Sequence, residues 1–152
     1  MLKETIEAVD INIKRAKSDY DEIKSWDSLS PKYFEDNDKR RVVDSFIFRF
    51  IKIQDLIGEK FFKEVLAGIG EYKRNMSFID ILDRLEKLEL IDNADKWNNF
   101  RELRNNLSHE YPANELEIIK DIKLALTAFQ EIADIYSNII KYLKERNLYS
   151  IK

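Results

Sequence analysis

The chain has 152 residues, no cysteine and a formal net charge of −3, with an isoelectric point near 5.4. The length suits a single domain over residues 1–152 that buries roughly 70% of the surface of its unfolded chain. The lack of cysteine excludes disulfide frameworks, cysteine-based zinc sites and thiol nucleophiles. The acidic balance argues against sequence-independent coating of nucleic acid. No segment approaches the ~18 apolar residues of a membrane span, so we expect a cytoplasmic protein that makes no membrane contact.

The first half of the chain predicts two long helices. Apolar residues three and four apart indicate a helix from about Lys3 to Lys24. The segment from Trp26 to Asp38 loses this period and contains a proline, which indicates a loop. A second helix is predicted from about Lys39 to Leu66, with Asp38 as its N-cap.

The predicted second helix is apolar on several faces, which is typical of a central helix or of one at a subunit interface. Gly58 lies inside it and costs about 1 kcal/mol relative to alanine. A close backbone contact or a kink would explain this glycine. Gly68 and Gly70 are expected to end the helix.

Two shorter helices follow. The first is predicted from about Phe78 to Leu90, where Ser77 and Asp80 form a capping-box pattern. The second begins near Asn93 and ends by the proline at position 112, which disfavours helical backbone at the residue before it.

The last predicted helix has Asn114 as its N-cap and Glu117 at the capping-box position. Its apolar residues form a long three-four series, which favours packing at shallow angles. The sequence therefore predicts an all-α fold, an antiparallel four-helix bundle with one short extra helix.

One segment, Arg101 to Pro112, concentrates polar chemistry at a helix end, and it holds the only histidine of the chain. A histidine can give or take a proton at neutral pH. An arginine can donate to two phosphate oxygens at once. Arg101, Asn105 and His109 recur every four residues and so share a helix face, and these residue types suit phosphate-ester chemistry on RNA.

The spacing of Arg104 and His109 raises a geometric difficulty. On a straight helix the two residues differ by about 140° around the axis, so their side chains diverge. Either the helix end bends near Ser108, or the site is shared between two subunits.

The residues Arg104, His109 and Tyr111 form an Arg-x4-His-x-Tyr pattern. This pattern resembles the motif of the HEPN superfamily, in the longer form that is characteristic of its HepT-like branch. The specific similarity is concentrated in residues 77–112. As a predicted helical bundle, the resemblance covers essentially the whole chain. Ser108 departs from the family pattern, because many relatives carry alanine or valine there.

The resemblance implies a HEPN-like bundle that forms a homodimer, brings two motifs together and cleaves RNA without a metal ion or other cofactor. Carried over by position, Arg104 and His109 would be catalytic, and Asn105 would orient or contact the phosphate of the substrate. Arg101, on the same helix face as Asn105, is a further candidate for substrate binding. HepT-like proteins are toxins, and their antitoxin is a minimal nucleotidyltransferase. That partner can silence the toxin by adding AMP to the motif tyrosine, here Tyr111.

Two other hypotheses remain open from the sequence. The chain could be a non-catalytic helical substrate-binding or partner subunit of a nucleotidyltransferase. It could also be a structural helical dimer in which Arg104 and His109 only stabilise a helix end.

Further residues could suggest function, but packing or solvation explains them more simply. Five phenylalanines could stack on bases and are expected to be core or interface instead; they are Phe46, Phe48, Phe50, Phe61 and Phe62. Two acidic groups, one over residues 35–38 and one over residues 115–121, are expected to be solvated surface and helix caps. Asp55 and Glu59 lie a turn apart on the second helix, and the sequence does not place them relative to the motif.

Overall fold

The computed structural model describes residues 1–109 and 115–148, and within these ranges the regular structure is entirely helical, which confirms the all-α prediction. The elements are α1 (Leu2–Ser25), η1 (Pro31–Glu35), α2 (Asn37–Leu56), η2 (Ile57–Phe61), α3 (Phe62–Gly68), α4 (Phe78–Lys87), α5 (Ala94–Ser108) and α6 (Glu115–Glu145). Among the described residues, no helix is both long and apolar enough to cross a lipid bilayer.

The start of α2 differs from the prediction by two residues. Asp36, not Asp38, is the N-cap, and its carboxylate accepts hydrogen bonds from the backbone N–H groups of Asp38 and Lys39. Asp36 has the extended backbone that an N-cap needs, whereas Asp38 already lies in the first turn, where a negative charge favours the positive end of the helix. The predicted loop before it contains one short 3-10 turn, η1.

The predicted second helix is present without a gap but changes its winding at Gly58. Helix α2 runs into η2, a single π-helical turn, and then into α3. A Cβ atom at Gly58 would lie 3.4 Å from Nε1 of Trp97, so α5 packs directly on the backbone of this turn. The expected close backbone contact at this glycine is therefore present, and the π turn supplies the irregularity.

Local capping signals set the starts of α4 and α5 as predicted. Ser77 and Asp80 form the capping box of α4, and Asn93 caps α5 by accepting from the backbone of Asp95. Helix α4 ends at Lys87, three residues before the predicted end. Glu89 adopts the left-handed conformation with φ of 60°, and this turn directs Leu90 into the core.

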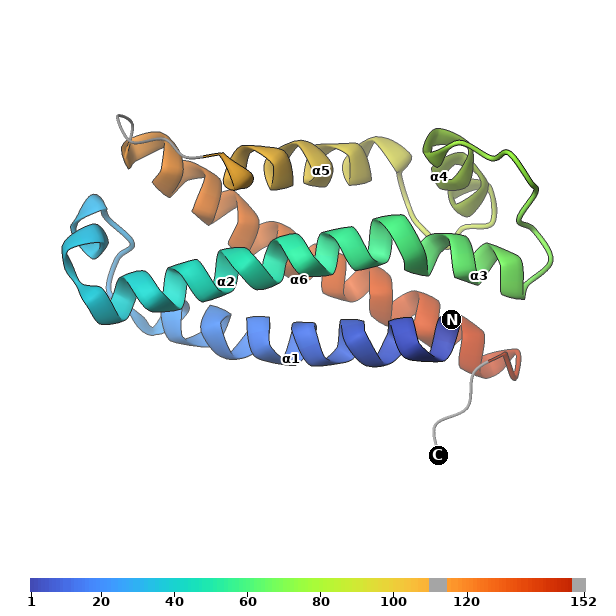
Figure 1. The fold of residues 1–152 in the computed structure, drawn as a ribbon, viewed down its shortest axis with the longest axis horizontal. Coiled ribbons are helices and arrows are strands. Elements are labelled where there is room, and N and C mark those ends of the chain that lie inside the picture. The colour runs from blue at the N-terminus through green and yellow to red at the C-terminus, as the bar shows by residue number, and fades with distance from the viewer. Residues whose placement is uncertain (110–114, 149–152) are drawn as a thin grey trace.

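Helices α1 and α2 run in opposite directions, as do α2 and α5, and α5 and α6, whereas α6 crosses α2 in the same general direction (Figure 1). Helix α1 packs along α2, α5 packs on the other side of α2, and α6 contacts both α2 and α5. The short helix α4 lies at one end of the molecule, against α3 and the start of α5. This arrangement places the last turns of α5, which carry the motif, between the end of α2 and the first residue of α4.

Aromatic side chains tie α1, α2 and α6 together in the core. The ring of Phe129 lies 5.6 Å from that of Tyr20 and 5.8 Å from that of Phe46, between centroids. Tyr136 packs against Phe61 at 5.0 Å, and its hydroxyl donates to Asp10 Oδ1 at 2.7 Å. These contacts join residues between 75 and 126 positions apart in the chain, and they hold α2 as a central helix.

The glycine at the π turn gives a stability prediction. Gly58→Val should lower the free energy of unfolding by about 1–3 kcal/mol, because its γ-carbons must displace the buried Trp97 ring. Gly68→Val is the matched control, since nothing lies within 4 Å of a Cβ atom at this exposed position. Its stability should stay within about 0.5 kcal/mol of wild type in urea denaturation. Equal effects at the two glycines would contradict the packing described for Gly58.

Candidate functional site

Helix α5 presents the motif at the boundary between its buried and exposed faces. Trp97, Phe100 and Leu103 are buried and fix the helix on α2 and α3, and Leu107 is half-buried. Arg104 lies seven residues after Trp97, so by helical rotation the two point in nearly the same direction, differing by about 20°. The guanidinium of Arg104 is therefore directed toward α2 as well.

Arg104 forms a bidentate ion pair with Asp55 of α2. Its Nε and Nη2 atoms each donate to one carboxylate oxygen, both at 2.9 Å. These hydrogen bonds raise the pKa of the Arg104 guanidinium above its usual value, and the negative charge of Glu59 adds to this shift. The exposed fractions of the two side chains are 28% and 31%, so the pair is accessible from solvent.

A hollow of about 350 Å³ lies beside this ion pair. Its lining combines the motif side of α5 with the end of α2, the π turn and the first residue of α4: Gln54, Asp55, Gly58, Glu59, Phe78, Arg101, Arg104 and Asn105. Two cations and two anions face the hollow, so its lining carries no net formal charge. It is a polar recess of a size that suits a small charged group rather than a large apolar ligand.

Arg101 and Asn105 line this hollow together, as their spacing of four residues predicts. The guanidinium carbon of Arg101 lies 4.3 Å from the ring centroid of Phe78 at the start of α4. Both Arg101 and Asn105 are exposed. The stacking on Phe78 orients the Arg101 guanidinium while leaving its edges open to solvent.

His109 is the first residue after α5, and its side chain is exposed. Its backbone is extended, with φ of −88° and ψ of 147°, so the helix stops at Ser108. The hydroxyl of Ser108 donates to the carbonyl of Asn105 at 2.7 Å and satisfies one of the terminal carbonyls of the helix. Only ψ of His109 departs from helical values, and ψ directs the residues that follow, so the angle of about 140° between the Cβ directions of Arg104 and His109 is retained.

Of the residues that the sequence singles out, the structure brings Arg101, Arg104 and Asn105 together at one recess. His109 is not among the residues that line it, and Tyr111 lies outside the described residues, as does Asn114. The structure adds Asp55 and Glu59 to the site. Their spacing of one turn on α2 was the only signal in the sequence, and it does not reveal which cation they approach.

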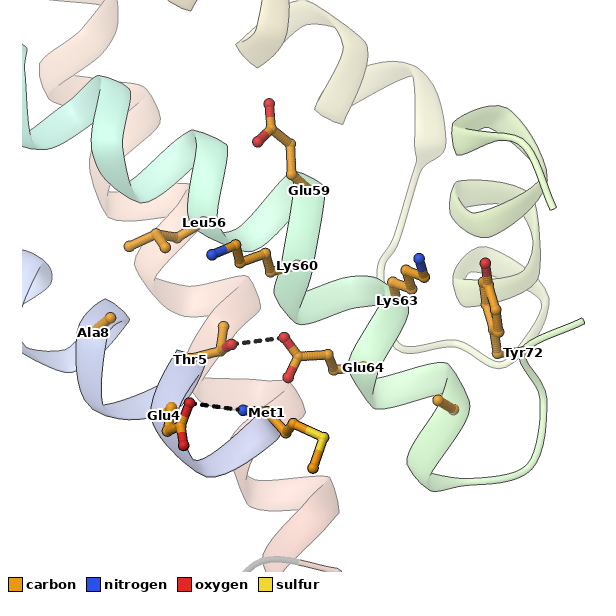
Figure 2. Close-up of a pocket in the computed structure, with 11 residues that line it drawn as sticks. Met1, Glu4, Thr5, Ala8, Leu56, Glu59, Lys60, Lys63, Glu64 and Tyr72 are labelled. Atoms are coloured by element: carbon orange, nitrogen blue, oxygen red, sulfur yellow. Dashed lines mark hydrogen bonds and ion pairs between the residues drawn. The ribbon is translucent and has the colours of Figure 1, made fainter. Parts of the chain in front are cut away.

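A second hollow, of about 530 Å³, lies between the start of α1 and the segment from η2 to α3. Figure 2 shows Glu59 pointing from η2 toward α5, whereas Lys60 points back toward Leu56. In its floor, Thr5 Oγ1 donates to Glu64 Oε1 at 2.7 Å. None of the motif residues lines this hollow, so we do not assign the motif chemistry to it.

The remaining candidates from the sequence have structural roles. Four of the five phenylalanines are buried in the core, at 0–1% exposure, whereas Phe48 is 58% exposed. In the two acidic groups, Asp36 caps α2, and Glu115 and Glu117 lie in the first turn of α6. Within residues 1–109 and 115–148, no group of three or more His, Asp or Glu side chains is placed to hold a metal ion.

Comparisons with protein-family models, with curated proteins and with solved structures gave no match to this chain.

The exposure of the Arg104–Asp55 pair predicts that it adds little to stability. In a double-mutant cycle of Arg104→Ala and Asp55→Ala, the coupling in the free energy of unfolding should be at most about 1 kcal/mol. The exposed pair of Lys17 and Asp21, with N and O atoms 2.6 Å apart, provides a reference cycle with an expected coupling of about 0.3–0.5 kcal/mol. A coupling above about 3 kcal/mol for Arg104 and Asp55 would instead mark a buried structural pair.

Proposed function

We propose that this chain is a HEPN protein of the HepT-like branch, an antiparallel four-helix bundle with one short extra helix, and that it acts as a metal-independent endoribonuclease toxin. The observation that carries the proposal is the clustering of Arg101, Arg104 and Asn105 around one recess at the end of α5, where exposed His109 leaves the helix. The Arg-x4-His-x-Tyr pattern gives these residues their proposed roles.

The proposed reaction needs only groups that this segment carries. Neutral His109 takes the proton of a ribose 2′-hydroxyl, and the 2′-oxygen attacks the adjacent phosphorus. The bond to the 5′-oxygen breaks, that oxygen takes a proton from water, and the products are a 2′,3′-cyclic phosphate and a 5′-hydroxyl. The guanidinium of Arg104 stabilises the charge that develops on the phosphoryl oxygens, and Arg101 and Asn105 bind the phosphate.

The proposed active form is a homodimer with a composite site. Phe48 supports this assembly, because it is a large apolar side chain with 58% exposure on α2. It lies seven residues before Asp55, two turns away and on nearly the same face of the helix. A second copy that covers Phe48 would therefore approach the recess that holds Arg104.

The proposed partner is a minimal nucleotidyltransferase that acts as the antitoxin in the cytoplasm. Its target on this chain would be the hydroxyl of Tyr111, two residues beyond His109, which it would modify with AMP. The transfer joins the Tyr111 oxygen to the α-phosphorus of ATP and releases pyrophosphate.

The decisive experiment is cleavage of a mixed RNA pool in EDTA by wild type and by His109→Ala. Mass spectrometry first establishes that Tyr111 is unmodified in the preparation. Wild type should cleave and leave 2′,3′-cyclic phosphate ends, and His109→Ala should be slower by about 10²–10⁴-fold, the usual contribution of a general acid–base group.

Two results would contradict the nuclease assignment. Cleavage that survives His109→Ala would remove His109 from the mechanism. No cleavage by either protein would favour the alternative, a non-catalytic partner subunit of a nucleotidyltransferase, which complex formation with the neighbouring gene product would then test.

The proposed dimer predicts a specific effect of Phe48→Asp. This change places a charge in the apolar contact, so the variant should be monomeric by light scattering at concentrations where wild type is a dimer, and its RNA cleavage should be lost. Leu124→Asp is the control, because Leu124 is 49% exposed on α6 and does not line the recess. A dimeric, active Phe48→Asp variant would rule out an interface on this face of α2.

A further inference from the structure

The ion pair with Asp55 uses one particular edge of the Arg104 guanidinium. Nε–H and the adjacent N–H of Nη2 share this edge, and each donates to one oxygen of Asp55 at 2.9 Å. Nη1 lies 3.5 Å from Oδ1 of Asn105, at the outer limit of a hydrogen bond. The end of the guanidinium, with one outward N–H on each terminal nitrogen, has no acceptor among the described residues beyond that contact.

We propose that Asp55 is a positioning residue for Arg104. By binding the Nε and Nη2 edge, it holds the guanidinium plane at the recess and presents the end of the group to two oxygens of a phosphate. This inference rests on the proposed function, because it assigns Asp55 a task in the RNA cleavage that Arg104 is proposed to assist.

The surroundings of Asp55 make it a rigid anchor for a long side chain. Asp55 lies one turn before Gly58, the glycine whose backbone packs against buried Trp97. An arginine side chain has four rotatable bonds and is held poorly by its own backbone, whereas a short aspartate on a packed helix moves little. A catalytic group that is misplaced by about 1 Å can lose 10²-fold in rate.

The negative charge of Asp55 provides a way to distinguish the positioning of Arg104 from the binding of RNA. RNA is a polyanion, so the carboxylate of Asp55 opposes its approach to the recess, and Glu59 does the same. Removing the charge of Asp55 should therefore leave ground-state binding of RNA equal or tighter while Arg104 loses its orientation. A residue that only contacted the substrate, or only stabilised the fold, would not produce this combination.

The test compares the steady-state kinetics of wild type and Asp55→Asn on one short RNA in EDTA. The Asn variant should show a kcat lower by about 10–100-fold with a KM that is unchanged or lower. In an Arg104→Ala background, Asp55→Asn should cause no further loss, because Asp55 acts through Arg104. Asp44→Asn, the same charge change on an exposed residue of the same helix, should stay within about twofold of wild type.

A second variant covers the case in which Asp55→Asn does not fold, which thermal melting reports. Asp55→Glu keeps the charge but moves the carboxylate by one methylene, and its kcat should fall by less than in the Asn variant, again without a rise in KM. Wild-type kcat in the folded Asp55 variants would overturn the positioning role and leave the nuclease assignment standing. A higher KM with unchanged kcat would also overturn it, because Asp55 would then contact RNA itself. If unmodified wild type does not cleave RNA, the nuclease assignment fails first and the role of Asp55 fails with it.

Discussion

The contact between Trp97 and the π turn at Gly58 determines how α5 approaches α2, and the candidate site depends on it. The indole is 1% exposed and packs with its ring 4.7 Å from that of Phe62 and 5.7 Å from that of Phe100. No side chain at Gly58 separates the ring from the helix backbone. Two turns further along nearly the same face of α5, Arg104 reaches Asp55. The buried contact between the Trp97 ring and the backbone of Gly58 thus sets the geometry of the Arg104–Asp55 ion pair, which remains accessible to water.

The balance of charge around the recess has a consequence for recognition. Two arginines and two carboxylates face it, and the whole chain carries a net charge of −3. Long-range attraction therefore contributes little to the approach of a polyanion, in contrast to proteins with a broad basic face. For the proposed reaction, selection among RNAs would depend on short-range fit to oriented groups, such as Arg101 stacked on Phe78.

Local chemistry explains which parts of the structure could be predicted from the sequence. The capping box of Ser77 and Asp80 and the apolar periodicity act within a few residues, and both appear as expected; the helix predicted to begin near Asn93 begins at Ala94, with Asn93 as its cap. The cap of α2 was predicted two residues too late, because Asp36 and Asp38 are both suitable by type and only the backbone conformation separates them. The pairing of Asp55 with Arg104 joins residues 49 positions apart, and no local pattern encodes which helices become neighbours. The π turn likewise had no signal beyond the glycine that permits it.

The helical backbone between Trp97 and Arg104 makes their spacing act as an angle. Each residue added within a helix turns the side chains that follow by about 100°. The seven residues from Trp97 to Arg104 therefore bring Arg104 round to the face that packs on α2. A single residue inserted between them would turn Arg104 away from Asp55, although the composition of the segment would hardly change.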